Sequence, residues 1–300
     1  MKAVLDHLRS ADFRGLLAEG EPMSRHCSLK AGGQTALLAV PEDVDELLTL
    51  LTALRDSNVP WIVIGGGTNV VFTEDRYRGC VIRLGGGFSS TVLRDDGQWE
   101  IGASCVTARI LADAVEKGFS GLEFAAGIPG TVGGAVRMNA GSHDGDFSGI
   151  CAEIQIAHGD EVRWAAGKDL EFSYRRLNLP PGSVITSIRA ALRREDPELV
   201  ANEVRRIQSK RKETQPLGIP SAGCWFLNPE GDSAGRLIDA AGLKGERVGG
   251  AEVSDVHANF LVNRGGAKPE DFVVLASRVK SAVYDRFGVD LKEEVQLVGS

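Results

Sequence analysis

The chain has 300 residues, of which 43% are hydrophobic and 25% are charged, a composition ordinary for a globular protein of two or three domains. Its 34 basic and 41 acidic residues give a net charge of −7, without the basic excess typical of nucleic-acid binding, so no nucleic-acid partner is expected. No apolar run approaches the ~20 residues of a membrane span, and the first residues lack the apolar core of a signal peptide. We therefore expect a cytoplasmic protein without a membrane partner.

The cysteines and histidines indicate neither a disulfide framework nor a metal site. The five cysteines are an odd number, and they lack the paired short spacings of zinc and redox sites. We expect four of them to be small core residues and consider Cys224 separately. No second histidine lies near His257 to complete a metal site.

The first part of the chain reads as alternating strands and helices. Residues 1–40 give few signals beyond a turn at 30–33 that leads into a strand at 36–40. Pro41 opens a helix with an acidic first turn and apolar residues at helical spacing. Strands at 59–64 and 80–84 follow, as in half of a nucleotide-binding fold. The chain contains neither G-x-G-x-x-G nor G-x-x-x-x-G-K-[ST], so a Rossmann site and a P-loop are both disfavoured.

The middle and the end of the chain continue this mixed pattern. We predict strands at 98–104, 153–157, 184–192 and 290–298, and helices at 108–117, 198–212, 234–241 and 270–287. Gly118, Gly242 and Gly288 end three of these helices. The basic run 210–212 fits either a solvated helix end or a phosphate contact.

Two glycine-rich loops stand out. Residues 127–141, with the sequence GIPGTVGGAVRMNAG, contain five glycines and almost no charge, so the segment presents backbone amides instead of side chains. Glycines let the backbone approach a ligand closely, and successive amides form a concave site suited to a pyrophosphate. A tight structural connection is the alternative. The other loop, residues 65–69 with the sequence GGGTN, favours the ligand interpretation, because two such loops can hold one long ligand.

Several polar residues are ambiguous when each is read alone. Cys224 follows a glycine at a loop-to-strand junction among aromatic neighbours, where a cysteine is more often a core residue than a catalyst. His257 and Asn259 place polar groups in an otherwise apolar strand, where a histidine is usually structural. Residues 174–176 fit a surface strand end, and Glu294 alternates with apolar residues as a solvent-facing carboxylate would.

Taken in order, these segments resemble the UDP-N-acetylenolpyruvoylglucosamine reductase (MurB) family, flavoenzymes of bacterial cell-wall precursor synthesis. The resemblance covers roughly residues 23 to 299, and the absence of an insertion around Tyr174 is similar to the shorter, type II, members. It is carried by residues 65–69, 127–134, 138–141, 174–175, 221–226, 228–229, 234–238, 257–260 and 294–295.

The resemblance implies an α+β fold with an FAD-binding domain of the vanillyl-alcohol-oxidase (PCMH-type) kind. Its two αβ subdomains are expected at 1–84 and 85–196, a substrate-binding domain at 197–289, and a strand returning to the active site at 290–300. FAD is expected to bind without a covalent link. The residues implied to hold FAD are Gly65, Gly66, Gly67, Thr68, Asn69, Gly127, Gly130, Thr131, Gly133, Gly134 and Asn139.

The activity implied by the resemblance is reduction of UDP-N-acetylglucosamine enolpyruvate to UDP-N-acetylmuramate. NADPH reduces the flavin and leaves, and the substrate then receives a hydride from flavin N5 at C3. By carry-over, Arg175 and Glu294 stabilise the resulting charge at the substrate carboxylate, and Cys224 occupies the position of the usual serine proton donor. The substrate contacts implied are Tyr174, Gln215, Asn228, His257 and Asn259. The oligomeric state is open, with a monomer favoured.

Three positions depart from the family pattern. Leu177 replaces the serine of Tyr-Arg-x-Ser, and Leu227 replaces the lysine of Phe-Lys-Asn-Pro, so a lysine contact is missing or comes from another residue. At Cys224, a thiol, whose pKa is ordinarily ~8.5, is a stronger acid than a serine hydroxyl, so proton donation can survive the change. The alternatives are an FAD-dependent oxidase of the same fold acting on another substrate, and an inactive nucleotide-sugar-binding homologue.

Overall fold

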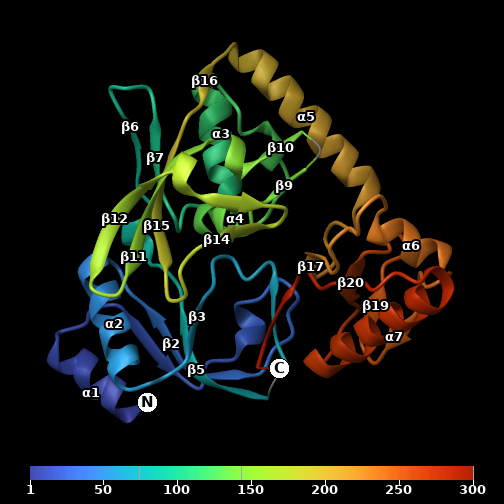
Figure 1. Ribbon diagram of the computed structural model, residues 1–300, viewed down its shortest axis with the longest axis horizontal. Coiled ribbons are helices and arrows are strands. Elements are labelled where there is room, and N and C mark those ends of the chain that lie inside the picture. Colours follow the sequence, from blue (N-terminus) through green and yellow to red (C-terminus); the bar gives the residue numbers. More distant parts are fainter. Residues whose placement is uncertain (74, 143, 300) are drawn as a thin grey trace. The chain divides into compact units, whose positions relative to one another are not determined.

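The computed structural model of the chain describes residues 1–73, 75–142 and 144–299 and consists of two compact units (Figure 1). Unit 1 comprises Met1–Glu19, Ala36–Gly66 and Arg78–Lys210, and unit 2 comprises Gly20–Thr35, Gly67–Tyr77 and Arg211–Ser300. Each unit is built from segments that are distant in sequence. The division into domains at 84/85, 196/197 and 289/290 stays a prediction, because the units are defined by compactness alone.

Most of one small sheet lies in unit 1, with two helices packed beside it (Figure 1). The strands, in the order β1-β2-β5-β3, are β1 (Leu16–Glu19), β2 (Gln34–Val40), β5 (Arg76–Ile82) and β3 (Trp61–Val63). The helices are α1 (Lys2–Ser10) and α2 (Val44–Asp56). Asp43 begins α2 by accepting a hydrogen bond from the amide of Glu46, which confirms the helix predicted after Pro41. Neither α1 nor β1 was predicted.

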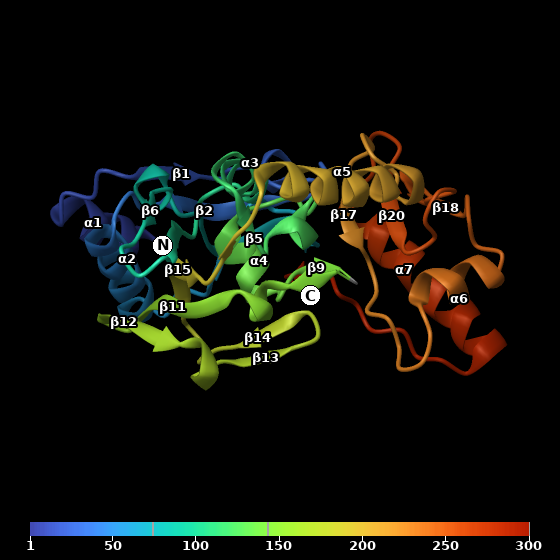
Figure 2. The ribbon, with the colours of Figure 1, turned by 90° about the horizontal axis from the view of Figure 1, so that it is seen from above.

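A second sheet of unit 1 is antiparallel and has five strands. In order they are β12 (Glu161–Ala166), β11 (Cys151–His158), β15 (Val184–Ala190), β7 (Trp99–Gly102) and β6 (Thr91–Leu93). Helix α3 (Thr107–Lys117) packs in the same core and ends at Gly118, whose φ of 65° is left-handed, as predicted. Short strand pairs complete the unit: β8 (Phe119–Ser120) with β16 (Arg193–Arg194), β9 (Gly141–Ser142) with β10 (Gly145–Asp146), and β13 (Glu171–Ser173) with β14 (Arg176–Asn178). Figure 2 shows β13 and β14 side by side.

Unit 2 packs helices α6 (Ala234–Ala240) and α7 (Pro269–Phe287) with a four-stranded antiparallel sheet (Figure 1). The sheet order is β17 (Ser221–Cys224), β20 (Phe260–Asn263), β19 (Ala251–Val253) and β18 (Arg247–Val248). Separately, β4 (Val70–Phe72) pairs in parallel with β21 (Gln296–Val298). Helix α5 (Pro197–Thr214) contains the last point at which the chain passes between the units. Among the described residues, no helix is both long and apolar enough to cross a membrane.

Three sequence-based expectations about local structure are wrong. The glycine-rich segment 127–141 contains a short helix, α4 (Val132–Arg137), within what was expected to be a bare loop. The last strand covers only Gln296–Val298 of the predicted 290–298, because only these residues pair with β4. His257 and Asn259 precede β20 and do not lie within it. The basic run 210–212 lies in the last two turns of α5, as the helix-end interpretation requires.

Candidate functional site

The two glycine-rich loops, the first at residues 65–69 and the second at residues 127–141, meet within unit 1. Gly65 faces Thr131 so closely that a Cβ built on Gly65 would lie 2.2 Å from Thr131 Oγ1. Thr131 is the N-cap residue of α4, yet its hydroxyl makes no cap hydrogen bond. Nor does any other described residue hydrogen-bond this hydroxyl. The arrangement therefore leaves a hydroxyl group beside two closely packed backbone segments, available to a ligand.

The amides of the second loop divide into two sets. The N–H of Val132 donates to the Cys105 carbonyl, and the N–H of Gly133 donates to the Ala103 carbonyl, both at 2.9 Å. No described residue accepts from the amides of Gly127, Gly130, Thr131 and Gly134. Gly127 and Gly130 have φ values of 80° and 107°, which favour glycine. The loop thus fits a pyrophosphate, although through fewer amides than the glycine count implies.

The neighbours Gly133 and Gly134 give a matched test of this site. A Cβ on Gly133 would lie 2.7 Å from the Ala103 Cβ, whereas one on Gly134 would meet only Thr131 Oγ1, at an ordinary 3.5 Å. We expect Gly133→Val to destabilise the fold by about 2 kcal/mol through overpacking. Gly134→Val should leave the melting temperature nearly unchanged and weaken FAD binding at least tenfold. Calorimetry and flavin fluorescence titration measure the two effects; normal FAD affinity in Gly134→Val would exclude this loop from the cofactor site.

Tyr174 and Arg175 form the two-residue turn between β13 and β14. Arg175 has a φ of 58°, in the left-handed region that a residue with a Cβ enters at a cost. Its Nη2 donates to the Gly141 carbonyl at 3.0 Å, and its guanidinium carbon lies 5.0 Å from the centroid of the Tyr174 ring. The hairpin therefore holds Arg175 against the end of the second glycine loop, in a strained conformation typical of functional positions.

Asn139 joins the same loop to this hairpin. Its Nδ2 donates to the Ser173 carbonyl at 3.1 Å and to Asp146 at 3.3 Å, and its Oδ1 accepts from the Ser148 amide at 3.0 Å. The side chain is only 4% exposed, so its polar atoms are satisfied within the protein. The direct cofactor contact implied for Asn139 stays a prediction. The structure gives it a role in holding the hairpin.

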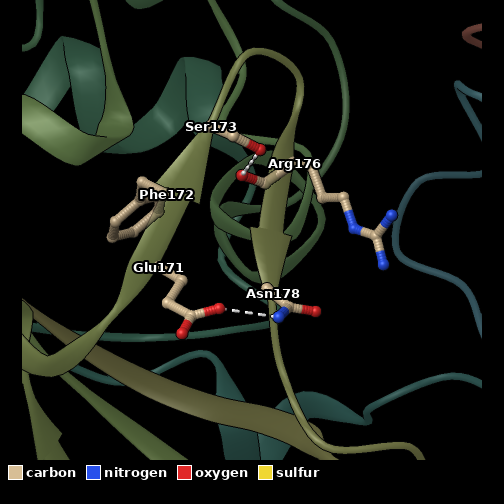
Figure 3. Close-up of a pocket in the computed structure, with 5 residues that line it drawn as sticks. All are labelled: Glu171, Phe172, Ser173, Arg176 and Asn178. Carbon is tan, nitrogen blue, oxygen red and sulfur yellow. Dashed lines mark hydrogen bonds between the residues drawn. The ribbon is translucent and has the colours of Figure 1, made fainter.

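An open pocket of about 360 Å³ lies beside the hairpin and is lined by Glu171, Phe172, Ser173, Arg176 and Asn178 (Figure 3). Across it, Asn178 Nδ2 donates to Glu171 Oε2 at 2.8 Å. Leu177 does not line this pocket, because its side chain is fully buried in the core of unit 1. The departure at Leu177 therefore substitutes a core-packing side chain for a serine.

Cys224 lies at the end of β17, where the strand is irregular. Ser221 pairs with Val262 and Cys224 with Phe260, so the register shifts between them, and Gly223 adopts a left-handed φ of 78°. Cys224 is partly exposed, whereas the other four cysteines are buried. The distinction made from sequence between Cys224 and four core cysteines is thus confirmed.

Unit 2 also brings Glu294 and Asn69 next to this strand. The Glu294 amide donates at 2.8 Å to the carbonyl of Trp225, the residue that follows Cys224. The Glu294 carbonyl accepts from Asn69 Nδ2 at 3.1 Å, and the Gln296 amide donates to the Asn69 carbonyl at 3.0 Å. Asn69, in the first glycine-rich loop, therefore hydrogen-bonds the backbone of both Glu294 and Gln296.

His257 and Asn259 support the chain on the other side of Cys224. The Asn259 amide donates to His257 Nδ1 at 3.2 Å, so the proton of the neutral ring lies on Nε2. Burial lowers the pKa of His257, which keeps the ring neutral at pH 7. The Asn259 side chain, 2% exposed, exchanges two hydrogen bonds with the backbone of Phe226, at 2.8 and 2.9 Å. In the structure, the Asn259 side chain therefore holds the segment that follows Cys224 in place.

The remaining expected substrate residues, Asn228 and Gln215, contact or follow helix ends. Asn228 Oδ1 accepts from the Ala234 amide at 3.0 Å and so caps the start of α6. Gln215 follows α5 directly, and its amide donates to the Arg211 carbonyl at 2.9 Å.

Ser28, which was not a sequence candidate, contacts both the first loop and β17. No spacing or motif around Ser28 indicates these contacts, since they join residues far apart in the chain.

The candidate residues are shared between the two units. Unit 1 holds Gly65, Gly66, Gly127, Gly130, Thr131, Gly133, Gly134, Asn139, Tyr174 and Arg175. Unit 2 holds Gly67, Thr68, Asn69, Gln215, Cys224, Asn228, His257, Asn259 and Glu294. Among the described residues, no cluster of histidine, cysteine and carboxylate side chains suits a metal ion.

Comparison with known proteins agrees with this arrangement. Residues 35–160 match the family of FAD binding domains, and residues 215–298 match the UDP-N-acetylenolpyruvoylglucosamine reductase C-terminal domain. The chain is 43% identical over 293 residues to the UDP-N-acetylenolpyruvoylglucosamine reductase of Pelobacter propionicus, with 98% of this chain and 99% of the relative covered.

Solved structures give the same assignment. UDP-N-acetylenolpyruvylglucosamine reductase (MurB) from Thermus caldophilus aligns with a TM-score of 0.83 at 34% identity, over 95% of this chain and 98% of that chain. Physcomitrella patens BBE-like 1 shares the fold alone, with a TM-score of 0.50 at 16% identity over 64% of this chain and 44% of that chain. The expected α+β fold, with a PCMH-type FAD-binding domain and a C-terminal αβ domain, is confirmed. The chain belongs to the UDP-N-acetylenolpyruvoylglucosamine reductase family.

Proposed function

We propose that the chain reduces UDP-N-acetylglucosamine enolpyruvate to UDP-N-acetylmuramate, with FAD as cofactor and NADPH as reductant, in the synthesis of peptidoglycan precursors. The observation that carries this proposal is the 43% identity to a named reductase over 98% of the chain. Reduction of the enolpyruvyl double bond adds one hydride at C3 and one proton at C2. The flavin supplies the hydride chemistry when it is bound.

The residues around the two glycine-rich loops fit FAD. The Thr131 hydroxyl and the amides of Gly127, Gly130 and Gly134 have no hydrogen-bond partner among the described residues, so they are available to phosphate oxygens. In unit 2, Gly67 has a left-handed φ of 63°, and a Cβ there would lie 1.9 Å from the His26 carbonyl. The first loop therefore depends on glycine for packing as well as for ligand approach.

Three side chains act on the substrate in this proposal. Arg175 and Glu294 stabilise the charge that develops at the enolpyruvyl carboxylate after hydride transfer, and Cys224 donates the proton to C2. Charge placed before the reaction is most effective, because the site need not reorganise. The strained turn at Arg175 and the bracketed backbone of Glu294 support this role, since both restrict where the charged groups can lie.

The departure at Leu227 removes a cation from the expected substrate site. Leu227 donates its amide to the Lys292 carbonyl at 2.8 Å, and the Lys292 ammonium forms an ion pair with Asp290. The Lys292 backbone therefore pairs with Leu227 at this position, while its exposed ammonium pairs with Asp290. Location in the cytoplasm and a monomeric state are further parts of the proposal.

We expect the purified protein to be yellow and to release its flavin on acid precipitation. Binding through backbone amides and a hydroxyl holds FAD without a covalent bond, so the flavin should appear in the supernatant. Its identity as FAD follows from chromatography against FAD and FMN standards. A colourless protein that takes up no FAD after refolding with the cofactor would remove the proposed function.

A further inference from the structure

We propose that Ser28 is a positioning residue, whose hydroxyl holds the Cys224 strand in register with the first glycine-rich loop. This role rests on the proposed function, in which Cys224 is the proton donor. Ser28 Oγ donates to the Ser221 carbonyl at 2.6 Å, and the Ser28 amide donates to the Gly67 carbonyl at 2.9 Å. One residue thus joins the start of β17 to the loop expected to contact FAD.

The strand that carries Cys224 needs such support because its own ladder is weak. The register shift between Ser221 and Cys224 interrupts the pairing with β20, and Gly223 gives the backbone there additional freedom. Side chains compensate at both ends. Ser28 holds the Ser221 carbonyl, and Asn259 holds Phe226 with two hydrogen bonds. Cys224 lies between these two attachments.

Together these contacts form a closed circuit of hydrogen bonds within unit 2. It runs from Gly67 to Ser28, from Ser28 to β17, from Trp225 to Glu294, and from Glu294 back to Asn69 in the same loop. A closed circuit fixes its members more firmly than separate pairs do, because each contact restricts the next. Ser28 links the loop to β17 by a side-chain hydroxyl, which also lies 3.3 Å from the Gly67 carbonyl. Removal of this hydroxyl leaves the bond from the Ser28 amide to Gly67 in place and changes neither the loop sequence nor Cys224.

Substitution of Ser28 by threonine or valine tests the role with side chains of equal shape. In Ser28→Val the hydroxyl is absent, so we expect substrate-driven reoxidation of the flavin to slow about tenfold, the effect of one lost hydrogen bond. Reduction of the flavin by NADPH should change less than about twofold. Ser28→Thr should recover most of the rate. Ser28→Ala serves if the branched variants do not fold. Ser10→Ala, which removes an exposed hydroxyl bonded to the His7 carbonyl at 2.7 Å, is the control.

Two further readouts separate positioning from general stability. Alkylation of Cys224 in the FAD-loaded protein, followed by mass spectrometry, should be several-fold faster in Ser28→Val than in Ser28→Thr; the buried thiols do not interfere. In a Cys224→Ala background, Ser28→Val should cause no further loss of reoxidation rate. Equal alkylation rates in Thr and Val variants, or a full additional loss in that background, would overturn the proposal. If wild-type reduced flavin is not reoxidised by the substrate, the proposed function fails, and the alkylation rates alone decide the role of Ser28.

Discussion

In Arg175→Ala and in Glu294→Gln, reduction of the flavin by NADPH should stay nearly intact, while reoxidation by the enolpyruvyl substrate slows by about two to four orders of magnitude. In the proposed function, the two residues act on charge that develops only after hydride has reached C3, so the first half-reaction should not need them. Stopped-flow absorbance of the flavin separates the two half-reactions.

Two neighbouring residues provide matched controls for this experiment. Arg176 follows Arg175 in the hairpin, and Glu293 precedes Glu294 and pairs with Lys280 at 3.1 Å. Arg176→Ala and Glu293→Gln remove the same charges from adjacent positions, and we expect at most a few-fold change in reoxidation. If both half-reactions slowed equally in Arg175→Ala and Glu294→Gln, the assignment of these residues to the charge formed after hydride transfer would be wrong.

Cys224→Ser should remain active, whereas Cys224→Ala should lose about two to four orders of magnitude of turnover, the usual contribution of a general acid. Serine restores the donor found in the family, and alanine has no proton to give. In Cys224→Ala, hydride transfer becomes reversible before protonation, so deuterium should exchange at C3 during the reaction. Equal reoxidation rates in the serine and alanine variants would show that Cys224 only packs beside Trp225 and Phe226.

The thiol also makes the wild-type protein sensitive to reagents that do not affect serine. Cys224 is partly exposed, and the other four cysteines are buried. Peroxide or an alkylating reagent should therefore inactivate the wild type, with protection by bound substrate, and leave Cys224→Ser active. Inactivation of both proteins at the same rate would assign the sensitivity to another residue.

Much of the local structure could be predicted because it depends on neighbours in sequence. Helices α2, α3 and α7 follow from apolar spacing and from their end residues, such as Gly118 and Gly288 with left-handed φ. Helix α4 could not be predicted, because it contains two adjacent glycines and is held by carbonyls of Ala103 and Cys105 in another segment. The shortness of β21 likewise reflects its distant partner β4.

The candidate site shows the same division. The ordered motifs identify the family, and the folded chain places Gly65 against Thr131 and the Glu294 amide on the Trp225 carbonyl, next to Cys224. What the motifs do not indicate is how these residues are held. Asn69 contacts Glu294 across 225 positions, and Ser28 contacts Ser221 across 193, so only the folded backbone reveals these links.

The most direct test of the proposed activity is the product formed by the FAD-loaded chain from UDP-N-acetylglucosamine enolpyruvate and NADPH deuterated at the transferred hydrogen. The proposed activity gives one product molecule per NADPH oxidised, heavier than the substrate by one deuterium at C3 and one solvent hydrogen at C2. Mass spectrometry and proton NMR detect both positions. Recovery of the enolpyruvyl sugar unchanged, from protein that binds FAD and is reduced by NADPH, would exclude the proposed activity.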